Sequence, residues 1–128
     1  MNYTLKAGIP YVHTWLALIG LLLMAPIVKG NTLHVGASFL YHALAEAAAV
    51  AVPGDTILVH GGTYAGGEYV DHLQGTSDAK IYILAAPGET VIYSGGGNAW
   101  QFSDGAYLHI AGFIFEHQTG NGLNFDDG

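Results

Sequence analysis

The chain has 128 residues, of which 51% are apolar and only 10% are charged, so it can build the core of one domain. It has no cysteine, which excludes a disulfide framework and a thiolate metal site. Three lysines and no arginine stand against ten carboxylates, a balance that excludes a nucleic-acid binder and gives no attraction to an anionic lipid surface.

The segment over 1–30 reads as a secretory signal peptide. Lys6 supplies the positive charge of the leading segment, Trp15 to Met24 is an uncharged apolar run, and Val28-Lys29-Gly30 precedes a cut before Asn31. The alternative is an uncleaved membrane anchor, because the stretch from Tyr11 to Val28 reaches the length at which a membrane span begins. We therefore expect a secreted or cell-envelope protein that is free of the membrane after cleavage.

Three segments follow from this division: a signal peptide over 1–30, a strand and capping helix over 31–54, and a strand-rich region over 55–128. Asn31 to Val35 reads as a short strand. Ser38 is a candidate N-cap for an amphipathic helix that reaches about Ala51, since apolar residues recur there at three- and four-residue spacing. Pro53-Gly54 then ends the helix.

From Asp55 onward, short apolar strands are each ended by glycine. Three pieces align when Thr56, Ile81 and Tyr107 are set as equivalent, and the two intervals differ by only one residue. Intervals of this length are typical of one coil of a β-solenoid. A second match joins PGDTILVHGGT to PGETVIYSGGG at a longer interval. We interpret that match as shared turn chemistry before a strand rather than as the coil length.

These features predict an all-β fold, a parallel β-helix of about three coils whose exposed first edge is covered by the helix. The order of PGDTILVHGGTY, GTSDAKIYILAAPGE and AYLHIAGFIFEHQTGNGL resembles the N-terminal part of secreted right-handed parallel β-helix proteins, the pectate-lyase-like superfamily. The resemblance covers about Asn31 to Gly128. It implies a right-handed coil and a protein that handles acidic or neutral polysaccharide along one parallel sheet, and its motifs specify fold more than activity.

The chemistry of a polysaccharide lyase needs a base and a cation that neutralises the uronate. Lys80 is the only basic residue left after signal cleavage, and a solvated loop lysine is its simpler interpretation, so no catalytic residue is assigned. Asp126 and Asp127 are adjacent, so they do not form the spaced carboxylate pair of a glycoside hydrolase. Hard oxygen ligands gather in the last coil and predict a calcium site, with turn-forming carboxylates as the alternative: Asp104, Asn124, Asp126 and Asp127.

Histidines and aromatic residues give further candidates. His60 and His109 fall near strand positions that could stack between coils, as a metal pair or as ordinary hydrogen-bonding groups. The aromatic residues suit either a sugar-stacking face or ladders of the solenoid: Tyr64, Tyr69, Tyr82, Tyr93, Trp100 and Tyr107.

Two functions remain open from the sequence. The first is the N-terminal part of a secreted protein that binds or acts on polysaccharide, a polysaccharide lyase in its full-length form. The second is a non-catalytic surface or adhesion β-helix. Because the strand pattern continues to Gly128 with no capping element, we expect further coils to be encoded downstream.

Overall fold

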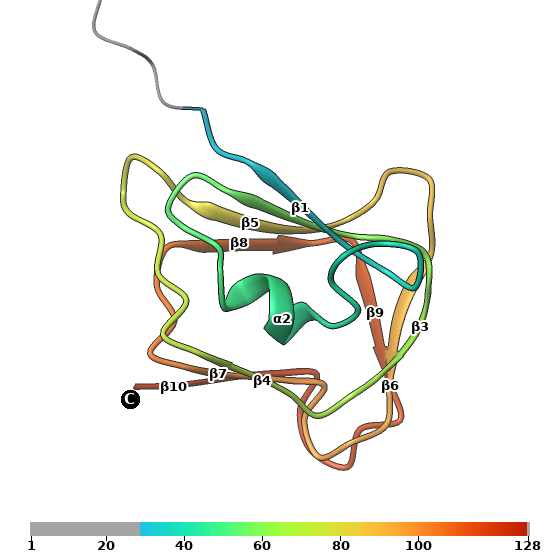
Figure 1. The fold of residues 1–128 in the computed structure, drawn as a ribbon. Helices are drawn as coiled ribbons and strands as arrows, with labels where there is room; N and C mark the ends of the chain where they lie inside the picture. The colour runs from blue at the N-terminus through green and yellow to red at the C-terminus, as the bar shows by residue number, and fades with distance from the viewer. Residues whose placement is uncertain (1–28, 128) are drawn as a thin grey trace, which may run out of the picture.

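The computed structural model describes residues 29–127, which form a parallel β-solenoid with three sheets (Figure 1). Sheet A holds β1 (Thr32–Val35), β2 (Thr56–Val59), β5 (Ile81–Ala85) and β8 (Leu108–Ala111). Sheet B holds β3 (Gly62–Ala65), β6 (Val91–Ser94) and β9 (Phe113–Glu116). Sheet C holds β4 (Glu68–Asp71), β7 (Trp100–Ser103) and β10 (Leu123–Asp126). The predicted parallel β-helix is therefore confirmed, with about four turns rather than three, because β1 pairs with β2 as the first strand of sheet A.

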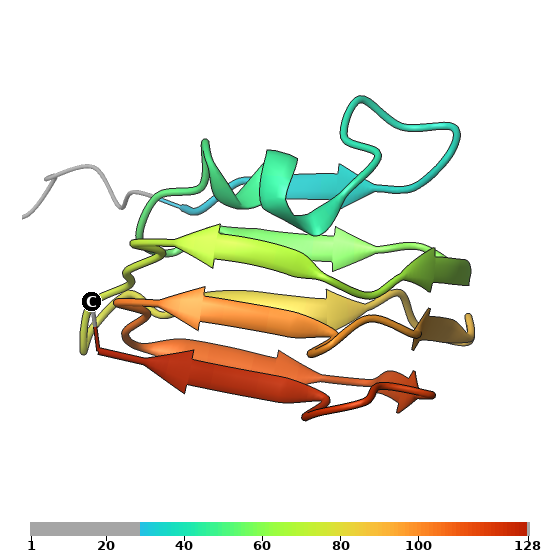
Figure 2. The same cartoon turned by 90° about the horizontal axis from the view of Figure 1, so that it is seen from below.

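The first turn contributes only β1, which is followed by the helix α2 (Leu44–Ala48), and each later turn contributes one strand to each sheet. Figure 2 shows the turns stacked along one axis. All strand pairs are parallel. The two matched segments PGDTILVHGGT and PGETVIYSGGG lie in different sheets, since the first enters β2 and the second enters β6. Their match is thus shared turn chemistry, as the sequence indicated.

The predicted register was wrong by one residue. Thr56 pairs with Tyr82 rather than with Ile81, and Tyr82 pairs with His109. Each of these two coils is therefore one residue longer than the sequence alignment required. The alignment fails because Thr56 lies on the outer face of its strand, whereas Ile81 is fully buried. A shift of one residue exchanges the two faces of a strand, so the buried residues select the observed register.

Inward side chains stack in columns along the solenoid. In sheet A the column consists of Leu33, Ile57, Ile83 and Ile110. Trp100 of β7 is fully buried, and its ring packs against the aromatic rings Tyr93, Phe102, Phe113 and Phe115. Most inward side chains of β2 and of β5, β6 and β7 are buried, whereas those of β8, β9 and β10 are only partly buried.

The capping helix α2 runs over Leu44–Ala48 only and lies at the β1 end of the stack (Figure 2). Its buried residues are Leu44 and Ala47. The expected start at Ser38 was wrong. Residues 36–42 instead form a turn in which the Gly36 N–H donates to the Tyr41 carbonyl. Ala43 is extended at the N-cap and makes no side-chain cap bond. The first helical amides Leu44 and Ala45 donate to the Glu68 carboxylate on β4.

Residues 29–127 contain no helix that is long and apolar enough to cross a membrane. The predicted signal peptide and the alternative anchor over 11–28 lie outside the described residues, apart from the last two positions of the leader.

Candidate functional site

The outer face of sheet C carries a column of polar and aromatic side chains that crosses three turns. Tyr69 pairs with Gln101, and Gln101 pairs with Asn124, so the three side chains project outward one above another. Tyr69 is 59% exposed, the amides are half-buried, and the alternate positions on the same strands point into the core. The parallel register thus places an aromatic ring and two amides on one exposed surface.

A second outward column runs beside the first. Asp71 pairs with Ser103, and Ser103 pairs with Asp126. The two columns are two residues apart on each strand and so share one face of the sheet. Together they form the sheet C surface, defined as Tyr69, Gln101, Asn124, Asp71, Ser103 and Asp126.

Hydrogen bonds fix the orientation of the amides on this surface. The Gln101 amide nitrogen donates to Asp126 Oδ2 at 2.7 Å, and its oxygen accepts from Asn98 and Asn124, each at 2.9 Å. Asn124 also donates to Asp126 Oδ1 at 3.2 Å. Because the Gln101 amide nitrogen also donates to the Phe102 carbonyl, all four of its hydrogen-bonding positions are occupied within the protein. Gln101 therefore holds its neighbours in place, and the Asp126 carboxylate and the Asn124 oxygen keep acceptor capacity for the hydroxyl groups of a polar ligand.

Two of the four predicted calcium ligands lie side by side in this network. Asn124 and Asp126 contact each other on β10, and Asp127 follows them. Asp104 points elsewhere: its Oδ2 contacts His72 Nδ1 at 2.5 Å, and only its backbone N–H reaches Asp126, at the carbonyl oxygen. Within residues 29–127 no group of three or more His, Asp and Glu side chains has a metal-binding arrangement. Calcium binding stays a prediction.

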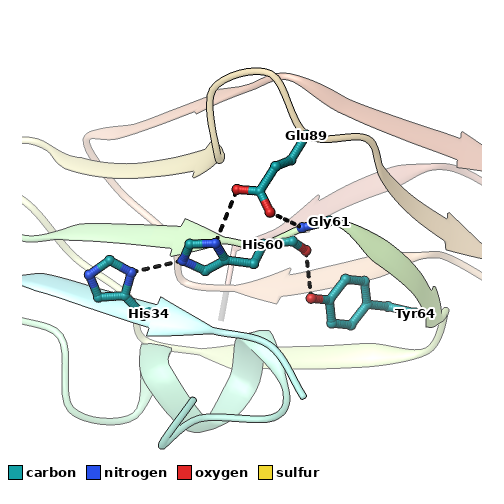
Figure 3. A network of polar contacts seen from close by, with 5 residues as sticks. All are labelled: His34, His60, Gly61, Tyr64 and Glu89. Carbon is teal, nitrogen blue, oxygen red and sulfur yellow. Dashed lines mark hydrogen bonds and ion pairs between the residues drawn. The ribbon is translucent and has the colours of Figure 1, made fainter. Parts of the chain in front are cut away.

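The histidines singled out in the sequence contact residues of neighbouring turns. His109 of β8 lies against Tyr82 of β5, with ring centroids 5.4 Å apart. His60, directly after β2, contacts His34 of β1 through a ring nitrogen at 2.8 Å (Figure 3). Glu89 accepts from the other ring nitrogen of His60 at 3.1 Å. The sequence had not singled out His34 and Glu89 as functional residues.

The six aromatic candidates divide between the core and the surface. Tyr64, Tyr93 and Trp100 lie inside the solenoid, and Tyr64 stacks on Tyr93 at 5.1 Å. Burial, followed by the nearby Glu68 carboxylate, raises the pKa of Tyr93 above its usual range, so this residue stays a neutral part of the core. The exposed rings belong to Tyr69, Tyr82 and Tyr107. Of these only Tyr69 stands on the sheet C surface.

Lys80, the basic candidate, is exposed and directly precedes β5 of sheet A, so it is not on the sheet C strands. The part of the chain that the structure describes has no enclosed pocket. Any ligand of the sheet C surface would therefore lie along an open face.

A scan of protein-family models found no matching family, and searches of curated proteins and of solved structures found no match.

Proposed function

We propose that the protein binds polysaccharide along the sheet C surface. The observation that carries the proposal is the outward column of Tyr69, Gln101 and Asn124, in which an exposed ring stands in line with two oriented amides. An aromatic ring offers its face to the apolar side of a pyranose, while amides and carboxylates bond the hydroxyl groups.

The solenoid also sets a regular spacing. Neighbouring parallel strands are about 4.8 Å apart, so a chain that lies along the stack meets a new set of side chains at each turn. Asp71 and Asp126 give this surface negative charge, and the whole chain carries a formal charge of −7. Repulsion disfavours uronate polymers in the absence of a cation, so a neutral polysaccharide is the preferred ligand.

Affinity electrophoresis of the full chain through gels that contain a soluble neutral β-glucan tests the proposal. We expect retardation, and we expect Tyr69→Ala or Gln101→Ala to weaken binding about tenfold, which corresponds to about 1.4 kcal/mol. Tyr82→Ala is the matched control, because Tyr82 is an exposed ring on the outer face of sheet A. Unchanged mobility of the parent protein, or equal losses in the Tyr69 and Tyr82 variants, would refute the proposal.

The acidic arm of the same experiment uses polygalacturonate with and without calcium. Binding that appears only with calcium, and is lost in Asp126→Ala, would place the cation at the predicted ligands on β10. Release of unsaturated uronides during the incubation with polygalacturonate would extend the proposal to a lyase. Binding without such products favours the non-catalytic surface β-helix instead.

A further inference from the structure

Three titratable side chains at the N-terminal end of the stack form one hydrogen-bonded chain (Figure 3). His34 comes from β1, His60 from the residue after β2, and Glu89 from the turn before β6. His34 Nδ1 lies 2.8 Å from His60 Nε2, and His60 Nδ1 lies 3.1 Å from Glu89 Oε2. The other Glu89 oxygen accepts the Gly61 N–H at 3.2 Å, which fixes the carboxylate in place.

The two imidazoles meet nearly end to end. Their ring centroids are 5.1 Å apart, close to the largest separation that a 2.8 Å contact between ring nitrogens allows. The two nitrogens therefore lie on the line between the ring centres, which is the geometry of a hydrogen bond. A metal ion shared by both rings would instead require them to turn toward a third point.

The contacts determine which nitrogens carry protons when both rings are neutral. An ionised Glu89 accepts a hydrogen bond, so His60 Nδ1 carries a proton and its Nε2 has a lone pair. His34 must then donate from Nδ1 to that lone pair. One added proton is compatible with this hydrogen-bonded series, because it can bind the outer nitrogen of His34 and a single N–H still lies between the two rings. Two added protons are not, because two N–H groups and two positive charges would face each other.

A neighbouring loop rests on this pair of rings. We call residues 36–42 the Phe39 loop. The Phe39 ring stacks on His60 at a centroid distance of 4.1 Å and on His34 at 5.3 Å, with interplanar angles of 15° and 16°. Gly36 leaves room for this stack, since a Cβ there would lie 3.1 Å from the Phe39 ring and 3.3 Å from the His60 Cβ.

We propose that His34, His60 and Glu89 form a proton-operated latch that holds the Phe39 loop on the solenoid near neutral pH and releases it in acid. The first proton leaves the loop in place, because a positive charge beneath the Phe39 ring is attracted to the ring face. The second proton separates the imidazoles and removes the surface on which Phe39 stacks.

The direction of the pH effect follows from the protons bound in each state. When the loop is released, both histidines can carry a positive charge at the same time. The released state therefore binds the second proton more readily than the closed state does. The closed state is therefore stable at higher pH and is lost as the pH falls. Because histidine changes charge between about pH 5 and pH 8, release belongs to the acid end of that range.

The loop and its anchor add an imidazole and a carboxylate: His42 ends the loop, and its backbone N–H donates to Glu46 Oε2 at 2.8 Å. Neither side chain hydrogen-bonds to the His34 or the His60 ring. Within residues 29–127, Glu89 is the only carboxylate that hydrogen-bonds to either ring, and no lysine forms an ion pair there. The Tyr64 hydroxyl donates to the His60 carbonyl oxygen at 2.7 Å. Burial, followed by the Glu89 charge, raises the pKa of Tyr64, so Tyr64 stays neutral through the range in which histidine titrates.

NMR of the full chain in a buffer with a metal chelator tests the latch. Ring-nitrogen spectra at about pH 8 should show protonated Nδ1 on both histidines, and two protonation steps should follow on acidification. Amide exchange reports the loop: the Phe39 N–H donates to the Gly36 carbonyl and the Gly36 N–H to the Tyr41 carbonyl. After correction for intrinsic rates, we expect their protection to fall roughly tenfold or more between pH 8 and pH 5.

His34→Gln gives the decisive variant, because its amide still donates to His60 but cannot take a proton. We expect loop exchange in this variant to become independent of pH. His109→Gln removes a histidine of sheet A that lies against Tyr82, away from the latch, and should leave the response intact. Constant loop protection in the parent protein, a protonated His60 Nε2 at pH 8, or a retained response in His34→Gln would each overturn the latch.

Discussion

At the scale of single residues, carboxylates at the corners join successive turns. Asp55 is buried, and its two oxygens accept the Asn31 N–H at 2.8 Å and the Val52 N–H at 2.9 Å. Glu89 occupies the matching place in the PGET segment and accepts the Gly61 N–H. The sequence match between the two segments thus marks a shared structural role, in which a carboxylate bonds the backbone of the preceding turn.

Asp55→Ala tests this role. The substitution leaves two N–H groups without their acceptor at a buried position, and each such group costs about 1–3 kcal/mol. We expect the free energy of unfolding to fall by about 2–6 kcal/mol, measured from the urea midpoint at constant slope. Asp127→Ala, at an exposed position, is the control and should shift the midpoint little. Equal midpoints for the two variants would contradict a structural role for Asp55.

At the scale of elements, the corner between β3 and β4 depends on a close approach of two backbones. A Cβ on Gly66 would lie 2.0 Å from the Gly95 carbonyl oxygen, a separation that no side chain can adopt without movement of the chain. Gly97 has open space around its Cα on the next turn. Substituting alanine at Gly66 and at Gly97 therefore distinguishes the stability lost by a clash between stacked turns from the stability gained by restricting the unfolded chain.

We expect Gly66→Ala to lower the thermal midpoint strongly, because the added methyl group forces apart two turns that pack at about 4.8 Å. Gly97→Ala should be neutral or stabilising by up to about 1 kcal/mol, since it restricts only the unfolded chain. Circular dichroism melts of both variants make the comparison. A Gly66→Ala protein that melts with the parent would show that the corner tolerates a wider spacing than the structure has.

The sequence predicts the elements better than their lateral placement. Glycine marked the corners, and alternation along residues 56–60 placed Ile57 and Val59 on one side of a strand, which is the side that β2 buries. The prediction of the strand register failed because the corners differ in length. The interval from Thr32 to its partner Thr56 is shorter than the interval from Thr56 to its partner Tyr82. The helix is shorter than its apolar pattern because Phe39 stacks on histidine rings and not on the helix face.

The candidate site depends on the same lateral placement. The interval from Tyr69 to Gln101 is much longer than the interval from Gln101 to Asn124, so no fixed repeat reveals that they share a column. The sequence singled out Asn124 and Asp126 for calcium, and the structure shows them bonded to Gln101 and to each other. Their residue types indicated polar chemistry in the last coil, but only the strand pairing shows which side chains they contact.

At the scale of the whole molecule, the two ends of the stack differ. The helix α2 covers the first turns through contacts with β1, β2 and β4. In the described chain, β8, β9 and β10 are each the last strand of their sheet, and the inward side chains on them are partly exposed. Since stability in stacked repeats is a sum of contacts between neighbours, we infer that strand stability decreases toward β8, β9 and β10.

Native-state hydrogen exchange tests this gradient. Amides of β5, β6 and β7, which pair with a strand on each side, should exchange only through the largest openings, and amides of β8, β9 and β10 should exchange through smaller ones. Phe102 and Phe125 give a matched pair of variants, because their rings stack at 4.7 Å but Phe102 is fully buried and Phe125 is 50% exposed. Phe102→Ala should cost about 3–5 kcal/mol and accelerate exchange throughout. Phe125→Ala should accelerate exchange in the last turn alone. Uniform protection across all three sheets, or an equal loss of unfolding free energy in the two variants, would show that the molecule unfolds as one unit without a weaker end.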